Sequence, residues 1–342
     1  MSPEARPLAW PYLLGVYKYK SAAGVAAGDE SDDKHADKAC RARLDALLRV
    51  ASERLRARDE ALLSDLRQLA VDTPRTDPHL LTIRSVMGRA ALNRLLLAYS
   101  VSENSAGLYQ GMGDLLVPFL LVFLPCSQHV APSSAATVAM AELEGDSLEL
   151  ADAAGMPSSR AEALAYACFE ALLVAQAPVF RGNYAAVGVH ASAVAAIVRA
   201  EDPPLQAALA AAGAEYSTIA LRPLLCMLRR ELSVEDCCVV WEALWAARPP
   251  QAHTSRPEGW GGAAVLTAAL LLSQREALLS CSTSLDLLEH MLNKTPGSED
   301  PLELGIRVQQ LAAAHSDRIQ DTLSPPTQAN PKPYCGSVSG QL

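Results

Sequence analysis

Asp72 and Arg75 lie three residues apart in this chain, with Pro74 between them. Because proline cannot continue a helix, it ends the helical pattern before it and lets Arg75 project from the helix surface. A guanidinium group is planar, always charged and able to donate two parallel hydrogen bonds, so it can stabilise negative charge on a partner molecule. Taken alone, this pair is more simply explained as a local salt bridge at a helix end.

A second stretch, residues 107–116, places Gln110 among Gly107, Gly111 and Gly113, just before an apolar run. Glycines permit close backbone approach and unusual dihedral angles, so such a turn can present a glutamine to a partner. A glutamine amide both donates and accepts hydrogen bonds, which suits it to orienting a water molecule. Taken alone, this stretch is more simply explained as a surface turn.

Together the two stretches resemble the paired motifs of the TBC-domain Rab GTPase-activating proteins, Ile-x-x-Asp-x-x-Arg and Tyr-x-Gln-Gly. Asp72 and Arg75 stand at the fixed positions of the first motif, and Gln110 and Gly111 at those of the second. Further stretches resemble the family in the same order: residues 6–17 its opening helix, 162–169 its central helix, and 221–232 with 241–245 its late Arg/Trp block. These landmarks identify the chain as a member of that family.

The resemblance implies an all-α TBC fold of two helical subdomains forming a groove, where a GTP-bound Rab-family small GTPase of vesicle trafficking would dock. It implies that Arg75 is an arginine finger and Gln110 a glutamine finger, which together accelerate GTP hydrolysis in the partner's site. The chain would need no cofactor of its own, because the GTPase carries GTP and Mg²⁺. The resemblance also implies supporting or orienting roles for the neighbours of the fingers: Asp72, Thr76, Tyr109, Gly111 and Asp114.

The chain departs from the family pattern in both motifs and in the central helix. Leu108 stands where the second motif has tyrosine, with the tyrosine one place later at Tyr109, and Leu69 replaces the isoleucine of the first motif. Ala165 and Tyr166 stand where the central helix tends to have Phe-Trp. These departures keep open a Rab effector or scaffold that has the fold without activity. A helical adaptor that binds neither Rab nor nucleotide is the remaining alternative.

The composition favours helices as the elements that carry these motifs. Half of the residues are hydrophobic and only 5% are aromatic, with Ala and Leu dominating the apolar set. Apolar residues over 44–69 recur at helical spacing, which predicts one long amphipathic helix that ends before Pro74. We expect Asp77 to cap the next helix, whose apolar members run over 80–97.

Capping-box patterns predict the starts of two later helices, at Ser159 with Glu162 and at Ser233 with Asp236. A Gly/Asp/Lys-rich composition predicts weak structure over residues 22–38. Pro, Ser and Gly content predicts it over residues 126–158 and 325–342. The domain boundaries that follow are 1–125 for an N-terminal subdomain with both fingers, 126–158 for a flexible insertion, 159–324 for a C-terminal subdomain and 325–342 for a disordered tail.

Charge and cysteine usage argue against several other classes of protein. A net charge of −9 without a Lys/Arg-rich block argues against a nucleic-acid surface. The eight cysteines include no C-x-x-C pair, which suits reduced cytosolic thiols and argues against a metal site. No apolar run approaches the roughly 20 residues of a transmembrane helix. We expect a cytoplasmic protein that visits endomembranes peripherally, through its partner.

Other arrangements that carry catalysis are missing from the sequence. It contains no G-x-x-x-x-G-K-[ST] phosphate loop and no G-x-S-x-G turn, so we expect a GTPase activator that catalyses no reaction by itself. In the late block, Arg222 and Arg230 are candidate partner contacts. A solvated face or a structural pair is the simpler interpretation for these arginines, as for Arg229 and Glu231.

Overall fold

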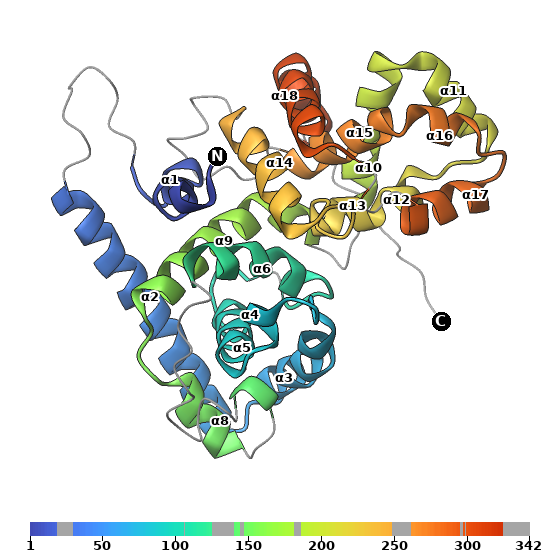
Figure 1. Ribbon diagram of the computed structural model, residues 1–342. Helices are drawn as coiled ribbons and strands as arrows, with labels where there is room; N and C mark the ends of the chain where they lie inside the picture. The colour runs from blue at the N-terminus through green and yellow to red at the C-terminus, as the bar shows by residue number, and fades with distance from the viewer. Residues whose placement is uncertain are drawn as a thin grey trace, which may run out of the picture.

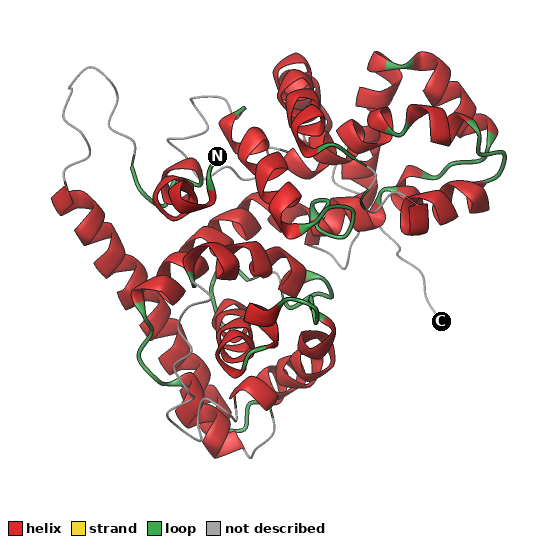
Figure 2. Ribbon diagram, viewed as in Figure 1, coloured by secondary structure: helices red, strands yellow, loops and turns green. Residues whose placement is uncertain are grey.

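The computed structural model describes residues 1–18, 30–105, 107–124, 140–143, 147–180, 186–247, 261–294, 297 and 299–323. Within these ranges the chain is helical without any strand, which confirms the all-α class (Figure 2). The expected tail over 325–342, and residues 126–139 and 144–146 of the expected insertion, lie outside the described residues. None of the described helices is both long and apolar enough to span a bilayer.

The N-terminal half of the molecule contains the helices up to α9, and Figure 1 shows α2 through α9 gathered in one body. Their bounds are η1 (Pro3–Ala5), α1 (Arg6–Leu13), α2 (Glu30–Arg56), α3 (Glu60–Asp72), η2 (Thr73–Arg75), α4 (Leu81–Arg84), α5 (Val86–Ser100), α6 (Met112–Phe123), α8 (Ser147–Ala154) and α9 (Arg160–Phe180). Helix α5 is buried without a break from Ala90 to Tyr99. It therefore forms the centre of this half, against α2, α3 and α6.

The C-terminal half contains the helices from α10 onward, in yellow-green to red in Figure 1. Their bounds are α10 (Val187–Glu201), α11 (Pro203–Ala211), α12 (Tyr216–Ile219), α13 (Leu221–Cys226), α14 (Val234–Ala246), α15 (Gly262–Ser273), α16 (Arg275–Leu279), α17 (Ser284–Glu289), the π-helical turn η4 (His290–Lys294) and α18 (Pro301–Leu323). Helix α15 is buried from Gly262 through Leu272, between α10 and α18. An element that is apolar on all sides is expected at such a central position.

Aromatic side chains from both halves meet in one cluster. Trp10 of α1 packs edge-on against Phe119 of α6 and Trp245 of α14, with ring centroids 5.3 and 5.1 Å apart. Phe119 also lies 6.1 Å from Trp241 of α14 and 6.3 Å from Phe169 of α9. The two halves therefore share part of their hydrophobic core.

The predicted single helix over residues 44–69 is wrong, because the chain breaks between α2 and α3. Arg58 adopts a left-handed conformation with φ of 54°. The Asp59 side chain then caps α3 by accepting a hydrogen bond from the Leu62 amide at 3.1 Å. Leu55 and Leu62 lie seven residues apart on either side of this break. The apolar spacing is therefore continuous across a point where the helix is not.

The next helix is also divided, and Asp77 does not cap it. Asp77 has φ of 40°, and the short helix α4 begins only at Leu81. Ser85 ends α4 and starts α5, whose Gly88 amide donates to the Ser85 hydroxyl at 3.0 Å. A Cβ on Gly88 would lie 1.9 Å from the Thr82 carbonyl oxygen, so only glycine permits this close approach.

The two predicted helix starts are confirmed, and the reciprocal pair of capping-box hydrogen bonds forms at the first of them. The Ser159 amide donates to Glu162 Oε2 at 2.8 Å, and the Glu162 amide donates back to Ser159 Oγ at 3.1 Å. Ser233 caps α14 by accepting from the Asp236 amide at 3.1 Å. These starts were predictable because each is set by residues within one turn.

Two segments that we expected to be weakly structured contain helix. Residues 30–38 form the first turns of α2, which begins at Glu30. Within the expected insertion, α8 packs against α2 and buries Leu150, Ala151, Ala153 and Ala154. Small apolar residues with helical spacing allow this close packing despite the polar composition around them.

Candidate functional site

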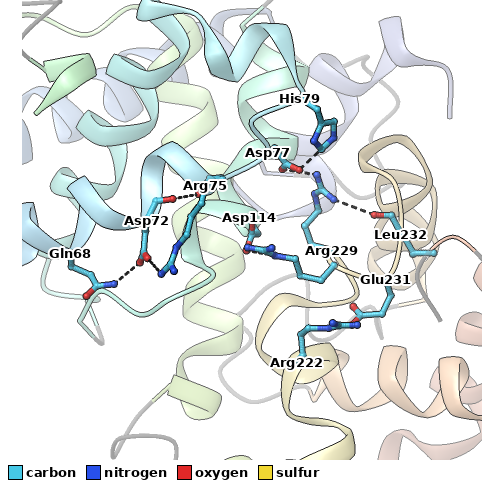
Figure 3. Close-up of polar contacts among 12 residues, drawn as sticks. Gln68, Asp72, Arg75, Asp77, His79, Asp114, Arg222, Arg229, Glu231 and Leu232 are labelled. Carbon is cyan, nitrogen blue, oxygen red and sulfur yellow. Dashed lines mark hydrogen bonds and ion pairs between the residues drawn. The ribbon is translucent and has the colours of Figure 1, made fainter. Parts of the chain in front are cut away.

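Arg75 lies at the end of η2, the single turn that continues α3 past Asp72. Its guanidinium donates to the Asp72 carboxylate, and its side chain is 50% exposed. Gln68 Nε2 donates to the other Asp72 oxygen at 2.7 Å (Figure 3). The local salt bridge that the spacing suggested therefore forms. It holds an exposed arginine at the end of a helix.

Two buried threonines, one on each side of Arg75, fix the turn that carries it. Thr73 Oγ1 donates to Asn93 Oδ1 of α5 at 2.6 Å, and Asn93 Nδ2 donates to the Met140 carbonyl oxygen at 2.8 Å. Thr76 Oγ1 donates to the Asp72 carbonyl oxygen at 3.0 Å. Thr73 and Thr76 are both buried. The backbone on either side of Arg75 is therefore well anchored while its side chain faces solvent.

Gln110 is exposed on the turn that leads into α6. Gly111 has φ of 97°, a left-handed value that glycine adopts without strain. A Cβ on Gly111 would also lie 3.1 Å from Cys226 Sγ of the C-terminal half. The Met112 amide closes the turn by donating to the Tyr109 carbonyl oxygen at 3.2 Å. The dihedral angle thus requires glycine here, and a Cβ would also press against Cys226.

Tyr109 and Leu108 support this turn from inside the N-terminal half. The Tyr109 ring stacks on Phe180 at the end of α9, with centroids 5.5 Å apart and ring planes 20° apart. Leu108 is partly buried and packs against the hydrophobic core. The leucine that replaces the family's tyrosine is therefore accommodated as an apolar contact.

The two motif segments touch each other in the fold. A Cβ on Gly113 would lie 2.9 Å from Thr76 Oγ1 and 3.3 Å from Thr76 Cγ2. The first turn of α6 therefore lies directly against the residue that follows Arg75. Segments that carry Arg75 and Gln110, 35 positions apart in the sequence, are brought together with both side chains exposed.

Asp114 lies in the first turn of α6 and is buried, at 3% exposure. Arg230 of the C-terminal half donates from Nε to Asp114 Oδ2 at 2.8 Å. Burial raises the pKa of the Asp114 carboxyl, and the charge of Arg230 acts against that rise. Cys226 lies beside the same turn, and burial raises the pKa of its thiol to about 12. This thiol therefore stays protonated near neutral pH.

A second ion pair between the halves forms close to Arg75. Arg229 Nη2 donates to Asp77 Oδ2 at 2.6 Å, and Arg229 Nη1 donates to the Leu232 carbonyl oxygen at 3.2 Å (Figure 3). The side chains of Arg229 and Asp77 are 6% and 12% exposed. This pairing was not predicted, because its partners are 152 positions apart. The only local signal was the charged run that includes Arg229 and Arg230.

Arg222 is held within the C-terminal half. Its Nε donates to Glu231 Oε1 at 2.7 Å, and its two terminal nitrogens donate to the Leu292 and Met291 carbonyl oxygens at 3.1 and 2.7 Å. Its side chain is 26% exposed. The structural pair, the simpler interpretation for this arginine, therefore forms. A contact between Arg222 and a partner stays a prediction.

Within the described ranges, no group of three or more His, Cys, Asp or Glu side chains is arranged to hold a metal ion. The chemical groups at the site are the guanidinium of Arg75, the primary amide of Gln110 and the Asp72 carboxylate that pairs with Arg75. Such an arrangement can stabilise negative charge and position water on a partner molecule, since both end groups are exposed.

Comparison with known proteins places this chain within a family. Residues 3–255 match the model of the Rab-GTPase-TBC domain. Over 244 residues the chain is 25% identical to the GTPase-activating protein gyp1 of Schizosaccharomyces pombe. The aligned region covers 71% of this chain and 43% of that protein. It is 32% identical to GTPase-activating protein GYP1 of Saccharomyces cerevisiae over 66 residues, 19% of this chain and 10% of that protein. The chain thus spans less than half the length of either relative.

Solved structures of this family share the fold. The Ypt/Rab-GAP domain of Gyp1p superposes with a TM-score of 0.66 at 16% identity, covering 92% of this chain and 89% of that one. A Chlamydomonas flagellar RabGAP TBC domain superposes with a TM-score of 0.54 at 19% identity, covering 92% and 81%. At these identities the likeness concerns the fold, and the family model supplies the membership. This chain belongs to the Rab-GTPase-TBC domain family.

Proposed function

We propose that the chain accelerates GTP hydrolysis by a GTP-bound Rab-family GTPase, with Arg75 and Gln110 entering the partner's nucleotide site. One observation carries the proposal. The two exposed side chains stand on segments that touch through Thr76 and Gly113, each on an anchored backbone. Both yeast relatives are named GTPase-activating proteins, which supports the same activity.

Arg75 would supply charge stabilisation in the transition state. In phosphoryl transfer, negative charge spreads over the transferred oxygens, and an arginine finger accelerates hydrolysis about 10³- to 10⁵-fold. That factor corresponds to roughly 4–7 kcal/mol of barrier. Releasing Arg75 from Asp72 costs far less, because half-exposed ion pairs contribute about 0–1 kcal/mol. Asp72 therefore orients the guanidinium before docking without preventing its transfer to phosphate.

Gln110 would hold the attacking water in line with the γ-phosphate. Its amide offers both a donor and an acceptor, as a bound water requires. The turn at Gly111 projects this amide outward, and Tyr109 holds the turn against Phe180. Both GTP and Mg²⁺ would be carried by the GTPase, so the chain acts as an activator without an autonomous reaction.

Docking would involve both halves of the molecule, in a groove between a finger-bearing half, residues 1–125, and a second half, residues 159–324. Arg230 lies near this junction and is 46% exposed, whereas Arg222 is turned to internal acceptors. Membrane association would be peripheral, through the GTPase, in a cytoplasmic setting.

Phosphate release from GTP-loaded Rab proteins, with and without this chain, tests the proposal. Arg75→Ala and Gln110→Ala should each lower the stimulated rate by orders of magnitude, about 10³-fold or more for the arginine. Folding should be unchanged, because both side chains are exposed. Arg67→Ala is the matched control, since Arg67 is an exposed arginine of the preceding helix α3. Equal stimulation by wild type and both finger variants would exclude the mechanism.

A Rab effector or scaffold without catalytic effect is the second candidate, and Leu108 at the family's tyrosine position is the observation that favours it. A loss of polar support for the glutamine turn would weaken catalysis but leave the docking surface. Binding of GTP-loaded Rab without faster hydrolysis would identify this function. Leu108→Tyr should then raise the stimulated rate.

A further inference from the structure

The segment between α13 and α14 is a tight turn that carries two arginines toward the N-terminal half. Met227 and Leu228 have φ of 48° and 64°, in the left-handed region that non-glycine residues rarely adopt. The turn is held in place by Trp241 Nε1, which donates to the Met227 carbonyl oxygen at 2.8 Å. At its other end, Glu231 is buried and paired with Arg222 at 2.7 Å. Surrounding contacts therefore fix a conformation that is intrinsically unfavourable.

From this turn, neighbouring arginines reach one aspartate beside each finger. Arg229 pairs at 2.6 Å with Asp77, two residues beyond Arg75. Arg230 pairs at 2.8 Å with Asp114, four residues beyond Gln110. Both aspartates belong to the N-terminal half, and both side chains are largely buried, at 12% and 4% exposure. One turn of the C-terminal half thus contacts both finger segments.

The ion pair of Arg229 with Asp77 restrains the backbone next to Arg75. Asp77 is held at φ of 40°, and Thr76 before it is extended, with ψ of 111°. The Thr76 hydroxyl fixes one end of this short segment to the Asp72 carbonyl, and Arg229 fixes the other end through Asp77. Loss of the Arg229 contact would free Asp77 to leave its left-handed conformation and move the residues before it.

The ion pair of Arg230 with Asp114 restrains the backbone next to Gln110. Asp114 Oδ2, the oxygen that Arg230 binds, would lie 3.8 Å from a Cβ placed on Gly111. The carboxylate therefore lies beneath the turn that presents Gln110. Without Arg230, a buried carboxylate that has lost its hydrogen-bonded ion pair would take up a proton or move toward water. Either change would alter the packing under Gly111.

We propose that the turn of residues 227–231 is a clasp that sets both fingers. Arg229 positions the Arg75 segment through Asp77, and Arg230 positions the Gln110 segment through Asp114. The inference rests on the proposed function of the two fingers. It makes both arginines positioning residues, and it gives Arg230 a role inside the chain in place of the partner contact expected from sequence.

The test compares kcat and KM for a GTP-loaded Rab between single variants and charge-neutral double variants. Arg230→Gln and Arg229→Gln should lower kcat about 10- to 100-fold with KM nearly unchanged, since misplacement near 1 Å costs about that much. Adding Asp114→Asn to Arg230→Gln, or Asp77→Asn to Arg229→Gln, removes the unpaired carboxylate and should restore most of kcat. A raised KM that the asparagine does not rescue would mean a direct partner contact and overturn the clasp.

A second arm asks whether each arginine acts through its own finger. In a Gln110→Ala background, Arg230→Gln should cause no further loss of kcat, whereas Arg229→Gln should still cause its full loss. If the kcat losses of Arg230→Gln and Gln110→Ala multiply in the double variant, the two residues act separately. That result would overturn the assignment of Arg230 to the glutamine finger.

Arg6→Gln is the matched control for lost stability. Arg6 Nε pairs with Glu242 at 2.6 Å, and both side chains are below 10% exposed, as buried as the pair of Arg229 and Asp77. Arg6→Gln should lower the urea midpoint without changing kcat. An equal fall of kcat in Arg6→Gln would show that destabilisation alone explains the clasp variants, and the proposal would be rejected.

Amide hydrogen exchange separates failure of the clasp from failure of the proposed function. If wild type accelerates no Rab, the proposed function fails, but exchange still tests the clasp. Arg230→Gln should speed exchange at residues 109–114, and Arg229→Gln at residues 75–79, whereas Arg6→Gln should change neither segment. Unchanged exchange in both finger segments would overturn the clasp whatever the activity of wild type.

Discussion

Thr76 and Gly113 form the contact through which the two finger segments meet. Thr76 is buried and donates from its hydroxyl to the Asp72 carbonyl oxygen, so its side chain has little freedom to turn aside. Gly113 presents bare backbone to it, and a Cβ there would lie 2.9 Å from Thr76 Oγ1. The spacing of the fingers therefore depends on a glycine that has no special dihedral angle.

Gly113→Ala should lower stimulated hydrolysis about 10- to 100-fold, because the new methyl group displaces Thr76 and with it the backbone of Arg75. Thr76→Ala in the same chain removes the atoms that the methyl would meet and should restore most of the rate. The rate of phosphate release from a GTP-loaded Rab checks both expectations.

Gly188→Ala is the control for that substitution, since nothing lies within 4 Å of a Cβ placed on Gly188. It should leave the stimulated rate unchanged and stabilise helix α10 by up to about 1 kcal/mol, since alanine is the better helix former. A Gly113→Ala chain with the wild-type rate would show that the fingers do not depend on this contact.

At the same scale, the exposed positions of Arg75 and Gln110 could be predicted from the sequence, but the side chains that support their segments could not. Arg75 and Gln110 stand in short motifs, and short motifs are local. The contact of Asp77 with Arg229 joins positions 152 apart, and that of Asp114 with Arg230 joins positions 116 apart. One sequence offers no physical basis for choosing these partners among the other charged residues.

Helix starts were predictable where one turn of residues determines them, as at Ser159 and Ser233. The division of the predicted helix over residues 44–69 was not predicted, because the apolar spacing continues across the break. The available signal was Asp59, which caps α3 and pairs with Arg54 at 2.9 Å. An acidic residue three positions before a leucine is too common in helices to indicate a break by itself.

The turn between α13 and α14 has a pH dependence that follows from Glu231. Burial raises the pKa of this carboxyl above its ordinary value, and Arg222 opposes the rise. Between the ordinary and the raised pKa, the folded chain holds a proton that the unfolded chain has released. The contribution of Glu231 to the free energy of unfolding therefore falls as pH rises through that window.

Glu231→Gln removes this titration and should change the pH profile of stability accordingly. The free energy of unfolding of wild type minus that of the variant should decrease as pH rises above the ordinary carboxyl value of about 4.3, then level off above the raised pKa. Urea denaturation from about pH 4 to about pH 8 measures it. Glu276→Gln, at an 88% exposed side chain, is the control. A difference that increases with pH would mean that folding lowers the pKa of Glu231 and would contradict this prediction.

Across the whole molecule, the aromatic cluster joins the two halves that the clasp also connects. Phe119 of α6 is fully buried and packs against Trp10, Trp241 and Trp245, which come from α1 and α14. The same helix α6 begins beside Gln110. The position of Gln110 is therefore tied to a core that both halves share.

Phe119→Ala should lower the free energy of unfolding by about 3–5 kcal/mol, the usual cost of emptying a buried aromatic site. Because the cavity opens at the shared core, the unfolding midpoints measured by tryptophan fluorescence and by far-UV circular dichroism should move to lower urea concentration together. Phe119→Leu keeps most of the apolar contact and should shift both by less. If only the fluorescence transition moves while the helical signal keeps its midpoint, the halves unfold separately. The aromatic cluster would then not couple the segment of Gln110 to the unfolding of the C-terminal half.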